Sequence, residues 1–128
     1  MSLIHGYLIN RYPIPTKRYC LTLGLKDNPN LVAEYRRIHS EEEAWPEIRK
    51  GIRSVGILEM ELYICANRVF MIVETPLDFD WNIAMEKLSH LPRQQEWESF
   101  VARFQNCPPN STSVEKWKLM ERMFYLYE

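Results

Sequence analysis

Hydrophobic and polar positions along the chain follow two periods, and these predict alternating strands and helices. From Lys17 to Leu25 apolar side chains recur at every second residue, the repeat of a strand with one buried face. From Leu31 to His39 they recur about every four residues, the repeat of an amphipathic helix. Between them, Asp27–Asn30 offers short side chains that cap a helix and a proline that cannot continue a strand.

The rest of the chain yields six further elements and one loop. In order, they are a helix with Pro46 in its first turn that ends at Ser54-Val-Gly56, strands Ile57–Ala66 and Val69–Glu74 joined by a short turn, helices Phe79–Leu88 and Arg93–Gln105, the loop Cys107–Ser113, and a final strand at Met123–Tyr127.

This order predicts an α+β fold of the ferredoxin-like βαββαβ plan, in which helices cover one face of a four-stranded antiparallel sheet. Residues 1–16 contain Pro13 and Pro15 and are expected to form an irregular arm, with residues 17–128 as a single domain. Four Trp, seven Tyr and five Phe make up 12% of the chain, more than a core of this size needs. Some of these rings are therefore expected to line a pocket or a subunit contact.

Charge and cysteine content exclude several classes of protein. Sixteen Lys and Arg against 17 Asp and Glu argue against a nucleic-acid partner. We expect no membrane segment, since no apolar run approaches 18 residues, and no signal peptide. Three cysteines without a CxxC spacing indicate free thiols in a reducing cytoplasm. Three histidines without a carboxylate at zinc-like spacing predict no metal site.

The strongest candidate for chemistry is His39, which lies one helical turn beyond Tyr35 and can share a target with it. Histidine gives and takes protons near neutral pH, and the Tyr35 hydroxyl can bind a substrate hydroxyl. The alternative is that His39 only ends its helix, where an imidazole favours the last carbonyls.

Four other positions are candidates with structural alternatives. Trp97 fits the core face of its helix, but a flat indole also suits the C–H face of a sugar, and Glu98 beside it can accept from hydroxyls. Glu59 and Glu61 project with Tyr63 from one side of their strand. They either bind hydroxyls and share acid–base work or form a solvated sheet edge.

Several segments together resemble the L-rhamnose mutarotase family, from about Lys17 to Tyr127. They are Tyr35-Arg-Arg-Ile-His39, Trp45-Pro46-Glu47, Gly56 before a strand containing Tyr63, Phe70–Glu74, Trp81-Asn82, the Trp97 helix and Met123-Phe-Tyr-Leu126. The resemblance implies a homodimeric α+β barrel that interconverts the anomers of a 6-deoxy-sugar without a cofactor. It also implies that His39 is the proton donor and that Tyr35 contacts the sugar.

The chain departs from the family pattern at positions expected in the pocket. The family has a tandem Trp pair where this chain has Trp97 and Glu98, and a sugar-binding Tyr where it has Met60. Two residues are also inserted between His39 and Trp45. The sugar therefore stays open between L-rhamnose and L-fucose.

The resulting hypothesis is an aldose mutarotase that works by general acid–base catalysis. His39 protonates the ring oxygen, Tyr35 and Trp97 orient the monosaccharide, and Glu59, Glu61 or Glu98 is the complementary base. Two alternatives share the fold plan: a dimeric α+β-barrel monooxygenase with a haem-ligating histidine, and a sugar-binding module without catalysis.

Overall fold

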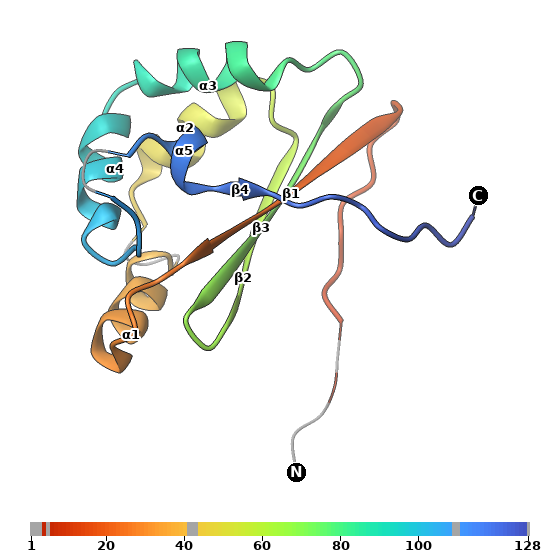
Figure 1. Cartoon of the computed structure of the whole chain (residues 1–128). Coiled ribbons are helices and arrows are strands. Elements are labelled where there is room, and N and C mark those ends of the chain that lie inside the picture. Colours follow the sequence, from red (N-terminus) through yellow and green to blue (C-terminus); the bar gives the residue numbers. More distant parts are fainter. Residues whose placement is uncertain (1–3, 5, 41–43, 109–110, 128) are drawn as a thin grey trace.

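Four strands form one antiparallel sheet with all the labelled helices on one side of it (Figure 1). The computed structural model describes residues 4, 6–40, 44–108 and 111–127. The strands lie in the order β2-β3-β1-β4, which confirms the expected α+β plan. Their bounds are β1 Thr16–Gly24, β2 Glu59–Cys65, β3 Arg68–Pro76 and β4 Lys118–Leu119. The helices are α1 Pro29–Ile38, α2 Pro46–Ser54, α3 Trp81–Ser89, α4 Gln94–Ala102 and the short α5 Ser113–Lys116.

The first strand and helix form where the two periods predict them. In β1, Leu21 and Leu23 are buried and continue to Leu25, all on the side that the helices cover. Asn28 then caps α1, because its side-chain oxygen accepts hydrogen bonds from two backbone N–H groups of the first turn. Pro29 follows at a position where its missing N–H costs nothing.

Two groups of buried side chains fill the layer between helices and sheet. One joins α1, α2 and α4 to the sheet through residues that include Tyr35, Ile48, Trp97 and Val101. The other centres on Val73, which is fully buried in β3. Members of both groups line the cleft described below.

The prediction of a final strand at Met123–Tyr127 is wrong. The last strand is β4, and it pairs with only two residues of β1. Met123 is 98% exposed and Tyr127 83% exposed. An apolar run favours a strand only where a neighbouring strand offers hydrogen bonds, and the paired stretch ends with the bond from the Met120 N–H to the Cys20 carbonyl.

Helices α3 and α4 also have bounds that differ from the prediction. Helix α4 begins at Gln94 because Arg93 before it has a left-handed backbone (φ 64°), and it ends at Ala102. The chain then turns so that Gln105 pairs with Leu25 in an isolated bridge. Helix α3 begins later than predicted, where the Asp80 carboxylate accepts from the N–H of Ile83.

The N-terminal arm lies against the sheet at β2. The Tyr12 hydroxyl donates to the Leu58 carbonyl at 2.9 Å, and the Asn10 amide donates to Glu59 at 3.0 Å. The Tyr7 ring meets the Tyr63 ring edge-on, with centroids 5.8 Å apart. Within the described residues, no helix has the length and apolarity needed to cross a membrane.

Candidate active site

A cleft of about 860 Å³ opens between the helices and the sheet, and most of the predicted site residues line it. Its walls come from the end of α1, from α2 and α4, from β1 and β2, and from the segment at β4. The polar and aromatic lining residues are Tyr19, Tyr35, His39, Trp45, Arg49, Arg53, Glu59, Trp81, Gln94, Trp97, Glu98, Gln105, Trp117 and Lys118.

Tyr35 and His39 form one unit at the end of α1. The rings are tilted against each other with centroids 4.4 Å apart. His39 Nδ1 lies 2.7 Å from the Tyr35 backbone oxygen. Because a carbonyl only accepts, Nδ1 carries the hydrogen, and the neutral ring keeps a lone pair on Nε2. His39 is also the C-cap residue of α1, as the structural interpretation of this residue expected.

The surroundings hold both side chains in their neutral forms near pH 7. Burial lowers the pKa of the His39 imidazole below its ordinary value of 6.5, and the nearby Arg49 cation lowers it further against the opposing bond to Tyr35. Burial raises the pKa of the Tyr35 phenol to about 12. Gln105 Nε2 donates to the Tyr35 oxygen at 3.3 Å, which leaves the phenol's own hydrogen for another acceptor.

Trp97 belongs both to the core and to the cleft wall. Its side chain is buried, and it meets the His39 ring edge-on at 5.2 Å between centroids. Trp45 contacts Trp97 in the same way at 5.1 Å and stacks on Phe100 at 5.6 Å. Arg93 covers Trp45, 4.0 Å from the ring centroid. This aromatic cluster restricts the orientation of the imidazole, because rings packed against other rings lose rotamer freedom.

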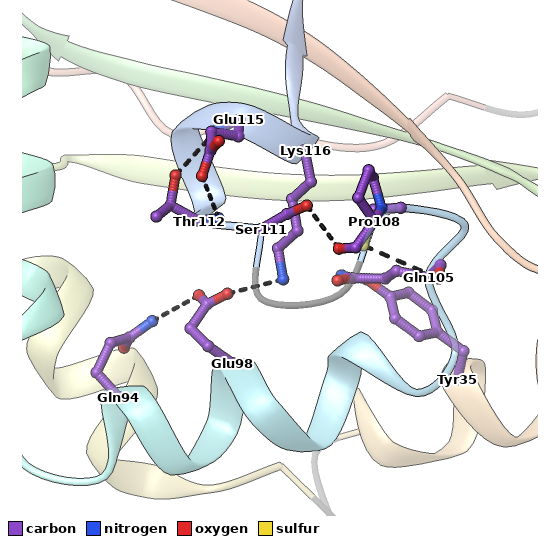
Figure 2. Close-up of polar contacts among 10 residues, drawn as sticks. Tyr35, Gln94, Glu98, Gln105, Pro108, Ser111, Thr112, Glu115 and Lys116 are labelled. Atoms are coloured by element: carbon purple, nitrogen blue, oxygen red, sulfur yellow. Dashed lines mark hydrogen bonds and ion pairs between the residues drawn. The ribbon is translucent and has the colours of Figure 1, made fainter.

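Glu98 is the anionic lining residue contributed by α4, and both of its oxygens are engaged (Figure 2). Gln94 Nε2 donates to Oε1 at 3.0 Å, and Lys116 Nζ lies 3.0 Å from Oε2. The Glu98 side chain is 31% exposed, whereas that of Lys116 is 1% exposed. Glu98 thus faces the cleft with Lys116 buried next to it.

The three predicted residues of β2 do not share one location. Met60 lines the cleft, and so does Glu59, whose carboxylate also accepts from Asn10 of the arm. Glu61 does not line the cleft. Its carboxylate accepts from the Tyr63 hydroxyl at 3.1 Å, and it lines a small groove beside the arm. Successive residues of a strand face opposite sides, so Met60 and Glu61 point apart.

Sequence reasoning missed Arg49, Gln105 and Lys116 as site residues. Arg49 could have been found, because it lies one helical turn after Trp45 on a helix that lines the cleft. Gln105 and Lys116 carry no local signal, since their partners Tyr35 and Glu98 are distant in sequence. Gln105 is 2% exposed, and its Oε1 has no hydrogen-bond partner among the described residues.

The side chains described by the structure include no cluster of three or more His, Cys, Asp or Glu that could hold a metal ion. What the cleft offers is a neutral imidazole, a neutral phenol, a held carboxylate and flat rings. Such a set can transfer protons to and from a polyhydroxylated molecule and pack against its C–H groups.

Known proteins of one family match nearly the whole chain. The profile of the L-rhamnose mutarotase family matches residues 18–126. An L-fucose mutarotase of Xanthomonas campestris pv. campestris is 35% identical over 88% of this chain and 90% of its own. An L-rhamnose mutarotase of Rhizobium johnstonii is 27% identical over 69% of this chain and 79% of its own. The crystal structure of an L-rhamnose mutarotase from Formosa agariphila has the same fold, with a TM-score of 0.63 at 20% identity over 86% of this chain and 98% of its own.

The state of His39 can be measured directly. We expect its imidazole to be neutral at pH 7 with the hydrogen on Nδ1, because the Tyr35 carbonyl fixes the tautomer and burial disfavours the cation. Long-range ¹H–¹⁵N NMR spectra of labelled protein, recorded across a pH titration, report both properties. The assignment requires a midpoint below 6.5, and an Nε2–H tautomer would contradict the geometry.

Proposed function

The chain belongs to the L-rhamnose mutarotase family, and from that premise we propose that it interconverts the α and β anomers of a 6-deoxy-hexose, with L-fucose favoured over L-rhamnose. It is a sugar mutarotase, and therefore an isomerase. The preference for L-fucose is supported by the higher identity to the L-fucose mutarotase than to the Rhizobium L-rhamnose mutarotase. The observation that carries the mechanism is the His39–Tyr35 unit inside the cleft.

In the proposed reaction, His39 carries a proton between two oxygens of the sugar. Nε2 takes the proton of the anomeric hydroxyl while that oxygen forms the carbonyl and the bond from C1 to the ring oxygen breaks. The imidazolium then protonates the ring oxygen, which has received the bond's electron pair. Both oxygens are attached to C1, so one nitrogen can reach both. Rotation about C1–C2 and the reverse steps close the ring to the other anomer.

The remaining lining residues bind and orient the sugar in this proposal. The Tyr35 hydroxyl donates its free hydrogen to a sugar oxygen, since its own oxygen accepts from Gln105. Trp97 and Met60 pack against C–H groups and the methyl group of the 6-deoxy-sugar. Glu98 accepts from sugar hydroxyls, and Glu59 closes the rim of the cleft. No separate carboxylate base is needed, because His39 serves both oxygens.

Anomer exchange of freshly dissolved L-fucose and L-rhamnose, followed by NMR, tests this function. We expect acceleration of both sugars, faster with L-fucose, and a loss of about 10²–10⁴-fold in His39→Gln, because positioned proton transfer contributes that much. His90→Gln is the matched control, since the His90 side chain is exposed and its ring nitrogen lies beside Glu86, one turn earlier, away from the cleft lining.

Acceleration of neither sugar, or full activity in His39→Gln, would overturn the proposal. Saturable sugar binding without acceleration would instead identify a sugar-binding module.

We also propose that the protein is a homodimer. Apolar side chains are exposed in the arm and in the tail beyond β4, among them Leu8, Met123, Phe124 and Leu126. Exposed apolar surface of this extent is typical of an interaction site, and a second copy would cover it. Sedimentation equilibrium should give twice the chain mass of 15.4 kDa. A monomer mass at micromolar concentration would be the contrary result.

A further inference from the structure

We propose that Lys116 is a positioning residue for sugar recognition: its buried ammonium fixes Glu98 so that the carboxylate receives two neighbouring hydroxyls of the sugar. This inference rests on the proposed function and deepens it, because it assigns a role to a residue outside the cleft lining. It also specifies the feature of the substrate that the site recognises, a pair of adjacent hydroxyls.

The first step of the argument is the way the Glu98 carboxylate is held. Gln94, one helical turn earlier on α4, donates to Oε1, and Lys116 of α5 reaches Oε2, both at 3.0 Å (Figure 2). Two donors on different oxygens fix the plane of the carboxylate as well as its position. A carboxylate with one partner could rotate about its terminal bond.

The second step is a count of acceptor sites. The two oxygens of an ionised carboxylate offer about four lone-pair directions, and the protein donors use one on each oxygen. One direction therefore remains on each oxygen of Glu98, and the side chain lines the cleft. Two adjacent acceptors match two hydroxyls on neighbouring carbons of a sugar ring. Charge-assisted bonds of this kind are about twice as strong as neutral ones.

The third step concerns the burial of Lys116, whose side chain is 1% exposed. Lysine is almost never fully buried unless it is paired. The desolvation of a buried pair often cancels its Coulomb attraction, so such a pair is a poor source of stability. Lys116 lies against Glu98, the acidic residue of α4 that lines the cleft, and this placement indicates that Lys116 holds Glu98 in position.

A purely structural role for the pair must be separated from recognition. Lys116 precedes Trp117, Lys118 and Leu119, which line the cleft, so losing the pair could also displace this wall. A displaced wall would weaken binding of every sugar alike. Loss of a held carboxylate would weaken only those sugars that carry the hydroxyls it receives.

The experiment measures Kd by calorimetry, and KM and kcat by anomer exchange, for L-fucose and its 2-, 3- and 4-deoxy analogues. In the wild type, we expect removal of either recognised hydroxyl to raise Kd and KM at least tenfold, as loss of a hydrogen bond to a charged group does. In Lys116→Met, Kd and KM for L-fucose should rise about 10–30-fold with kcat changed less than about threefold, and the analogues should no longer differ from L-fucose.

Three further variants make the result decisive. Lys116→Arg keeps the charge and should restore discrimination among the analogues. Lys87 is an exposed lysine of α3, and the control variant Lys87→Met should match the wild type. If Lys116→Met does not fold, the double variant Glu98→Gln with Lys116→Met removes the unpaired carboxylate and should show the same loss of discrimination.

An unchanged KM in Lys116→Met, an equal rise for L-fucose and every analogue, or wild-type discrimination in the double variant would overturn the role of Lys116 while leaving the proposed function intact. If the wild type binds L-fucose without accelerating exchange, the proposed function fails and the Kd comparison still decides the role of Lys116. If it neither binds nor accelerates either sugar, both proposals fail.

Discussion

The hydrogen bond from His39 Nδ1 to the Tyr35 carbonyl is the constraint on which the site depends. The last carbonyls of a helix have no partner within the helix, and here one of them takes the ring N–H at 2.7 Å. The bond ends α1 and selects the tautomer at the same time. Because Tyr35 is buried in the core, the carbonyl that holds the imidazole is itself fixed by the packing of α1 against the sheet.

On the side of the cleft formed by Tyr35 and Trp97, the contacts that pack the core are also the contacts that position the site residues. Trp97 is buried in the main hydrophobic cluster and also touches the His39 ring. Trp97 is therefore at once a core residue and a residue of the cleft wall. The polar side is built differently, since Glu98 is held by Gln94 and Lys116, and Tyr35 by Gln105.

Sequence alone predicts what depends on local spacing. The period of β1, the cap of α1 and the pairing of Tyr35 with His39 are of this kind. Prediction from sequence fails where a residue distant in the chain determines the local structure or the contact. The tail at Met123–Tyr127 has the composition of a strand, but the residues of β4 that pair with β1 are Lys118 and Leu119, before the tail begins.

Lys116 lies in an unremarkable polar stretch until the fold brings it to Glu98. Glu61 lines the small groove beside the arm and not the cleft, whereas Glu59, on the same face of β2, lines both, so strand alternation alone does not separate the two.

The pH dependence of anomer exchange tests the central claim that a neutral His39 starts the reaction. Burial and Arg49 lower the pKa of His39, so the neutral, proton-accepting ring predominates above that pKa. With the uncatalysed rate subtracted, exchange of L-fucose should be constant from about pH 7 upward and fall as pH drops through a midpoint below 6.5. An enzymatic rate that instead rises as pH falls through this range would show that the cationic ring is the active form and would contradict the account.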